Sequence, residues 1–142
     1  MAELSPYALR LALYLVLMLL FGRMLFVRPG LPRGVSLALA LIALAVVVTD
    51  AITRLSGVLG IAPADIDPAT AHWFLTGTPV GEAGLLRTVA VLAMLPLLAA
   101  ATPLGGPRRV ALLALSGMAL ASLSWNGHAA AGDGFGGTMR LV

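Results

Sequence analysis

The sequence predicts an all-α membrane protein whose four transmembrane helices form one bundle. Of its 142 residues, 60% are hydrophobic and only 11% are charged, and the mean hydropathy is +1.01. Soluble domains carry about 25% charged residues, so this composition argues against a water-soluble globular protein. Four segments approach the roughly 20 apolar residues that a helix needs to cross a bilayer. These are residues 7–27, 35–52, 84–101 and 109–128, and we treat residues 1–142 as a single transmembrane domain.

The first segment, residues 7–27, has signals at both ends. Ser5 and Pro6 suit the cap and first turn of a helix, and Pro29 begins a tight turn after it. Its apolar run continues into Arg23 without the small-residue cleavage pattern of a signal peptide. We therefore expect this helix to remain in the mature protein.

The second and third segments differ in their polar residues. Residues 35–52 are apolar on every face and end near Asp50 and Arg54, an i, i+4 pair expected near one membrane face. Residues 84–101 contain Pro96, which removes one backbone donor and predicts a kink that membrane helices tolerate.

The fourth segment, residues 109–128, is rich in small and hydroxyl side chains, which favour close helix packing over lipid exposure. They are Ser116, Gly117, Ala119, Ala121, Ser122 and Ser124.

Orientation follows from the arginines, because cytoplasmic connections carry an excess of basic residues. One side is expected to hold Arg23, Arg28, Arg33, Arg108 and Arg109, and the other to hold all six acidic residues and both histidines. Both termini and the outer loop, residues 53–83, should then face the periplasm. Within this loop, Pro63 and the pair Asp67-Pro68 are helix-start signals, and Trp73 suits the membrane interface.

Several function classes are disfavoured by the composition. A net charge of +3 on so few groups does not form the basic stripe that binds nucleic acid. The chain has no cysteine, no phosphate-binding glycine loop and no nucleophile elbow, so an enzyme is not expected. The expected partner is the lipid bilayer.

A metal site is the main chemical hypothesis. His128 lies near the expected end of the fourth helix, and a neutral imidazole there is a suitable ligand, with Asp133 as a second ligand or hydrogen-bond acceptor. His72 and Met139 are further contributors on the same side, and the thioether suits Cu(I). The alternative is that His128 only caps its helix and that His72 is a titrating surface residue.

Arg87 is the second feature, because a charge inside a span costs a few kcal/mol and must be paired or reach the interface. Asp50 and Glu82 are the acids expected at its depth. A structural ion pair that joins two helices is one interpretation, and a path for cations or protons is the other.

Three stretches resemble the bacterial copper resistance protein D family. TGTPVGEAGLLRTVAVLAMLPLL is similar to the start of that family's third helix, SLSWNGHAAAGDGFGGTMRLV to the end of its fourth, and LRLALYLVLMLLFGRMLF to its first. The resemblance implies an inner-membrane protein that transports or receives copper, helped by a periplasmic CopC-like copper protein. It also implies that His128 is the best metal-site candidate and that Arg87 belongs to the family's helix-start pattern.

Members of that family continue into further helices with additional histidines, so the chain resembles the amino-terminal half only. We expect a truncated or partial form, or one completed by a second polypeptide. A different class of function is a structural scaffold subunit without metal, in which Ser116 and Gly117 form the partner surface. A haem-binding subunit is a less favoured hypothesis. Its axial ligands should lie at bilayer depth, whereas His72 and His128 are expected too near the membrane surface.

Overall fold

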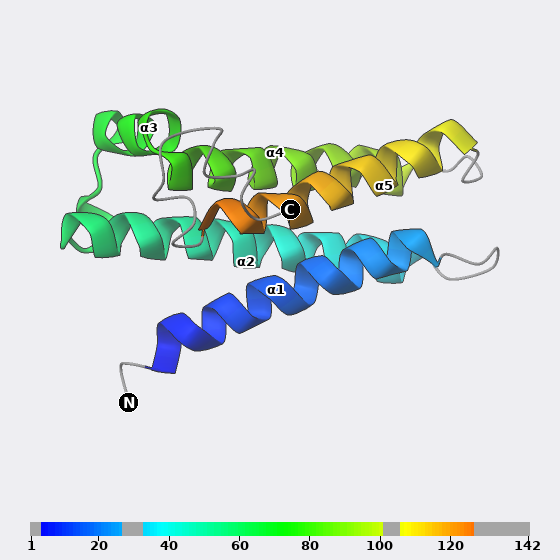
Figure 1. Cartoon of the computed structure of the whole chain (residues 1–142), viewed down its shortest axis with the longest axis horizontal. Helices are drawn as coiled ribbons and strands as arrows, with labels where there is room; N and C mark the ends of the chain where they lie inside the picture. Colours follow the sequence, from blue (N-terminus) through cyan, green and yellow to red (C-terminus); the bar gives the residue numbers. More distant parts are fainter. Residues whose placement is uncertain (1–3, 27–32, 101–105, 127–142) are drawn as a thin grey trace.

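The computed structural model describes residues 4–26, 33–100 and 106–126, and the regular elements in these ranges are all helical. Four long helices form a bundle with alternating directions, and a short helix lies across one end (Figure 1). The elements are α1 (Leu4–Leu25), α2 (Arg33–Leu59), η1 (Pro63–Asp65), α3 (Pro68–Gly77), α4 (Pro79–Ala99), α5 (Gly106–Ala121) and η2 (Ser122–Asn126).

The bundle is built as a ring in which neighbours are α1 with α2, α2 with α4, α4 with α5, and α5 with α1. Its core repeats at helical spacing, so each helix turns one face inward. Helix α1 contributes large side chains to this core and α2 mainly small ones. The core includes Leu13, Leu17, Leu20 and Met24 of α1, Ala40, Ala43 and Val47 of α2, Ala90, Val91, Met94 and Leu98 of α4, and Leu112 and Ala119 of α5.

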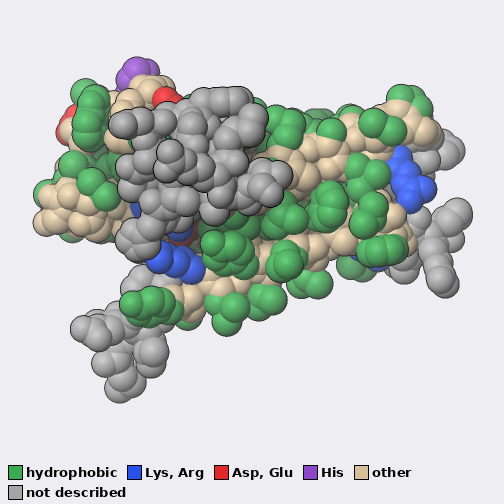
Figure 2. Space-filling view, viewed as in Figure 1, with side chains coloured by type: hydrophobic (Ala, Val, Ile, Leu, Met, Phe, Trp, Pro, Cys, Tyr) green, Lys and Arg blue, Asp and Glu red, His purple; other side chains and the backbone are tan. Residues whose placement is uncertain are grey.

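The outward faces are also apolar. Exposed side chains include Leu15, Met18, Leu41 and Ile42, and Figure 2 shows hydrophobic side chains along the visible flank of the bundle. Within the described ranges, three helices are long and apolar enough to cross a membrane: Tyr7–Leu25, Gly34–Leu59 and Pro79–Ala99. These helices support the prediction of an all-α membrane protein.

The fourth span, expected over residues 109–128, is not confirmed. The α-helical part of this region, α5, has 16 residues and continues as the 3-10 helix η2. Its first turn contains Arg108 and Arg109, which shorten the apolar stretch. A span needs about 20 apolar residues, so α5 alone is short of that length.

The outer region, expected as a loop over residues 53–83, is mostly helical. Helix α2 continues to Leu59 and ends where Gly60 takes a positive φ of 67°. Gly60 also donates its N–H to the carbonyl of Ser56, as a glycine after a helix end commonly does. The apolar pattern ends near residue 52, but the helix backbone continues for about two further turns. Within this part the Thr53 hydroxyl donates to the carbonyl of Thr49.

The expected helix starts in this region are confirmed. Pro63 opens η1, and Asp67 caps α3 by accepting hydrogen bonds from the N–H groups of Ala69 and Thr70. Pro68 occupies the first turn of α3, where its missing N–H costs nothing.

Helix α4 starts at Pro79, five residues before the expected residue 84, since the Thr78 hydroxyl accepts from the N–H of Gly81. It continues through Pro96 to Ala99.

Candidate functional site

Asp50 and Arg87 are charged residues in the middle of the apolar packing pattern. Asp50 continues the buried face of α2 that includes Ala43 and Val47, and Arg87 continues that of α4, which includes Ala90 and Met94. Their residues are only 4% and 1% exposed. Charged groups are almost never buried unless paired, so both should have partners close by.

The partners connect three parts of the bundle. Arg54 Nε donates to Asp50 Oδ2 at 2.7 Å, and Arg87 Nη1 lies 3.7 Å from the same oxygen. On its other side, Arg87 Nε donates to Ser122 Oγ at 2.9 Å and Nη2 donates to the Ser122 carbonyl at 3.3 Å. The guanidinium of Arg87 therefore joins α2, α4 and η2. We call Asp50, Arg54, Arg87 and Ser122 the buried polar cluster.

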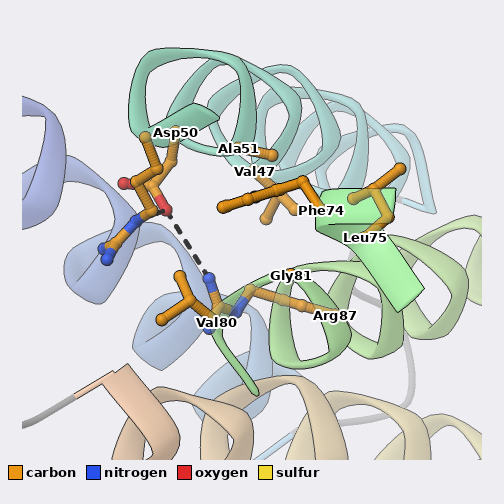
Figure 3. A pocket seen from close by; sticks show the side chains of 10 residues that line it. Val47, Asp50, Ala51, Phe74, Leu75, Val80, Gly81 and Arg87 are labelled. Atoms are coloured by element: carbon orange, nitrogen blue, oxygen red, sulfur yellow. Dashed lines mark hydrogen bonds and ion pairs between the residues drawn. The ribbon is translucent and has the colours of Figure 1, made fainter. Parts of the chain in front are cut away.

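A small cavity adjoins this cluster. Its volume is about 10 Å³, and Asp50, Arg54 and Arg87 line it together with apolar residues that include Val47 and Phe74. Figure 3 shows Asp50 and Arg87 facing one another from α2 and α4. A cavity of this volume is about the smallest that accommodates one water molecule. The separation of 3.7 Å is longer than a direct hydrogen bond, so the site has both the room and the polar groups for a bridging water.

Gly81 sets the approach of α3 to α4 beside this cavity. A Cβ atom built on Gly81 would collide with the backbone carbonyl of Phe74, so only glycine allows the two helices this close. The close approach buries Phe74, whose side chain lies against the cavity that Asp50 and Arg87 line. The side of the cluster facing α3 is thus closed by an aromatic ring.

The structure brings together three of the four residues named for ion pairs. Asp50 pairs with Arg54 within α2 and with Arg87 between helices. Glu82 is different, because it is exposed in the first turn of α4 and takes no part in the buried polar cluster. An acidic side chain in the first turn instead complements the positive end of the helix dipole.

Ser122 is the residue that sequence reasoning missed. We expected it to be a small residue for helix packing, but its hydroxyl donates to the carbonyl of Ala119 and accepts from Arg87. The sequence does indicate that Arg87 needs a further acceptor, because a buried arginine has more donors than one shared carboxylate can satisfy.

The expected metal ligands are only partly described. His72 lies on α3 and is exposed, at the end of the bundle where Figure 2 shows a histidine. His128, Asp133 and Met139 lie outside the described residues. Among the described residues no group of three or more His, Cys, Asp or Glu side chains could hold a metal ion.

The other polar feature of the outer region is the cap of α3. Hydrogen bonds from the hydroxyl and the N–H of Thr70 lower the pKa of Asp67 below its ordinary value of 3.8. This carboxylate is fully exposed, and it acts on the first turn of α3 rather than on the buried polar cluster.

At the opposite end of the bundle, arginines satisfy helix ends. Arg109 Nη2 donates to the carbonyl of Leu25 at the end of α1, and Arg108 Nη2 donates to the carbonyl of Ala100 after α4. The last carbonyls of a helix have no partner within it and carry partial negative charge, so both contacts are favourable. The two ends of the bundle are thus chemically different.

Comparison with known proteins identifies the family of the chain. Residues 1–138 match a family model described as Copper resistance protein D-like, N-terminal domain. No curated protein and no solved structure gives a match.

Proposed function

We propose, because this chain belongs to the copper resistance protein D-like family, that it takes part in copper transport and homeostasis in a bacterial inner membrane. The family match over residues 1–138 is the observation that carries the proposal. The three membrane-length helices and the apolar outer faces support a place in a bilayer. The family resemblance alone suggests the bacterial inner membrane.

The proposed orientation places both chain termini in the periplasm. It is supported by the alternating helix directions, which bring the ends of α1 and α4 and the starts of α2 and α5 to one end (Figure 1). Arg23, Arg108 and Arg109 lie at that end, and basic residues favour the cytoplasmic side. His72 and Asp67 on α3 and its cap are then periplasmic.

The copper ion is treated as cargo, with Cu(I) favoured. We propose His128 as its principal ligand, with His72, Asp133 and Met139 as contributors. Imidazole and thioether groups suit this soft ion. The position of η2 supports the proposal, because η2 packs against α4, which also packs against α3. His128 follows Asn126 by two residues, and His72 lies on α3.

Partners form the remaining part of the proposal. A periplasmic CopC-like copper protein would deliver or accept the ion at the α3 end of the bundle. A second polypeptide would supply further helices. The scaffold alternative is weakened by the packing of α5, since Ser116 is buried and a Cβ on Gly117 would contact the Phe21 ring of α1. The surface expected to bind a partner is therefore used inside the bundle.

The test is a Cu(I) titration of the detergent-purified chain against a competing chelator. We expect one ion to bind, binding to be lost in His128→Ala and weakened in His72→Ala. Ser124→Ala is the control, because Ser124 is exposed and, among the residues that the structure describes, its hydroxyl donates to the carbonyl of Ala121 in its own helical turn. Absence of binding by the folded wild-type chain would overturn the proposed copper site and leave a scaffold role.

A further inference from the structure

A second, larger cavity lies beside α3, between α2 and α4. Its volume is about 450 Å³, within the range of roughly 300 to 1,000 Å³ that is usual for ligand pockets. Helix α2 contributes Val48, Ala51, Ile52 and Leu55 to its lining. These residues recur at i, i+3, i+4 and i+7, so they form one stripe along the helix. The cavity therefore runs along α2 as a groove, and we call it the α3 groove.

The lining of the α3 groove is almost entirely apolar. Helix α3 contributes Phe74 and Leu75, and α4 contributes Leu85 and Thr88. Thr88 is the one polar side chain among the described residues that line it, and its hydroxyl donates to the carbonyl of Gly84. A buried water molecule needs roughly two to four polar partners, so the groove suits hydrocarbon rather than water.

The α3 groove opens on the outer surface of the bundle. Its deep part contains Leu55 and Phe74, which are buried, whereas Val48, Ile52 and Leu85 at its rim are exposed. Helices α2 and α4 are both long and apolar enough to cross a membrane. The rim therefore belongs to the surface that faces acyl chains when the bundle lies in a bilayer.

The α3 groove also has the direction and depth of a lipid chain. Helices that cross a membrane stand roughly along its normal, as acyl chains do, and the groove follows α2. The rise from Val48 to Leu55 is about 10 Å at 1.5 Å per residue. The hydrocarbon half of a bilayer is roughly 15 Å thick. Since η1 and α3 lie at this end of the bundle (Figure 1), the groove occupies the leaflet on the α3 side.

A thin wall separates the α3 groove from the buried polar cluster. Ala51, Phe74 and Leu75 line both the groove and the small cavity beside Asp50 and Arg87. Figure 3 shows the Phe74 side chain extending from α3 toward α2. An empty groove would leave Phe74 without partner atoms on its outer side, and such a gap forfeits dispersion energy. A hydrocarbon chain supplies these contacts without bringing water to the ion pair.

We propose that the α3 groove binds one acyl chain of a membrane phospholipid from the leaflet on the α3 side. The chain lies along the stripe of α2 and packs against Phe74, and the headgroup stays at the level of α3. This lipid site goes beyond the proposed function. It requires that the bundle lies in a bilayer, and it does not depend on whether the protein binds copper.

The experiment uses the full chain in vesicles of phosphatidylethanolamine and phosphatidylglycerol. A small fraction of phosphatidylcholine carries a diazirine in the middle of one acyl chain. Illumination links the diazirine to the residues it touches, and mass spectrometry of the digested protein locates the adducts. We expect them to be concentrated in residues 48–55 and 85–88. Leu11 and Leu15 are the reference for ordinary lipid contact, because both are exposed or partly exposed on α1, which begins at the end where α2 ends (Figure 1).

Two variants fill the groove from different helices. Thr88→Phe fills it from α4 and Ala71→Phe from α3, and each should reduce the labelling of residues 48–55 to the level of the α1 reference. Val89→Phe is the matched control, because Val89 is exposed on the same helix as Thr88 and does not line the groove. It should leave the labelling unchanged. Circular dichroism checks the folding of each variant, and if one does not fold, the other decides.

The outcomes are distinct. Enriched labelling that the filling variants remove supports the lipid site. Labelling no higher than that of the α1 reference, or unchanged in folded Thr88→Phe, overturns it, because the groove then meets lipid only as the rest of the surface does. A groove that stays unlabelled beside a labelled reference also overturns it and indicates another occupant, such as a second copy of this chain. If the reference is unlabelled too, the place in the bilayer fails first and the lipid site fails with it. The Cu(I) titration tests the copper site separately from each of these results.

Discussion

Arg87 Nη1 on α4 lies 3.7 Å from Asp50 Oδ2 on α2, and both residues are buried at core positions of neighbouring helices. Arg54 also contacts this oxygen, at 2.7 Å, so one carboxylate serves two guanidinium groups. Because Asp50 carries the negative charge that both arginines contact, it is the residue on which the buried polar cluster most depends. Without it, two arginines remain close together, and one of them is fully buried.

We therefore expect Asp50→Leu to destabilise the bundle strongly. Removing one partner of a buried ion pair costs about 3 to 5 kcal/mol, because the remaining charge is left uncompensated. The double variant Asp50→Leu with Arg87→Leu should recover most of this loss, since no buried charge then remains at the core position. Unfolding in detergent measured by circular dichroism would show the difference.

Glu82→Gln serves as the control, because Glu82 is exposed and outside the buried polar cluster. It should cost at most about 0.5 kcal/mol, the size of an exposed contact with the helix dipole, which is far below the loss in Asp50→Leu. A double variant as unstable as Asp50→Leu would contradict the interpretation, since the loss would then come from packing rather than from an unpaired charge.

Gly81 provides a prediction about α3. Gly81→Ala places a Cβ against the carbonyl of Phe74, and neither backbone can move without separating α3 from α4. We expect a cost of about 1 to 3 kcal/mol, which is typical of overpacking. Faster hydrogen exchange in residues 68–77 would be its signature. Gly84→Ala is the matched control in the same helix, because no atom of another described element lies within 4 Å of its added Cβ. Equal exchange in the two variants would show that the close approach is not required.

Part of this site follows from helix geometry alone. The i, i+4 spacing predicts the Asp50–Arg54 pair, and the cost of burying a charge predicts an acid near Arg87. Helix geometry also helps to decide whether Asp50 or Glu82 is the partner of Arg87. Glu82 precedes Arg87 by five residues, which places it about 140° away around the same helix at about 100° per residue. An acid from another helix was therefore the better expectation.

Other features depend on how the helices are arranged. Ser122 meets Arg87 only because α4 and α5 are neighbours in the ring, and no local pattern encodes that order. Hydropathy also ended the second helix near residue 52, where the apolar run stops, although the backbone continues helical to Leu59. Polarity marks where a helix leaves the apolar environment, whereas a residue such as Gly60 marks where it ends.

The cap of α3 predicts a pH dependence with a definite sign. Because the folded state lowers the pKa of Asp67 below 3.8, its stabilising contribution is complete above that ordinary value. The contribution is lost as the pH falls through the lowered value. We expect hydrogen-exchange protection of residues 68–77 to be constant above about pH 5 and to fall below about pH 4, after correction for intrinsic exchange.

Asp67→Asn should retain most of the cap, since asparagine also accepts from the first-turn N–H groups. It should lose the acid-dependent fall. If the variant keeps the same pH dependence as the wild type, another group is responsible.

The final prediction concerns orientation in the membrane. The chain has no cysteine, so a single introduced thiol can be located with a reagent that does not cross the inner membrane. Gly57 on α2 and Gly106 at the start of α5 lie at opposite ends of the bundle, and no side chain of the described ranges lies within 4 Å of a Cβ added at either position. Gly57→Cys should react in intact spheroplasts, and Gly106→Cys should react only after lysis. This result follows if arginines at the Gly106 end hold it on the cytoplasmic side, as the distribution of basic residues favours. The reverse labelling would place α3, His72 and the end of α5 in the cytoplasm, and a periplasmic copper partner could not reach them.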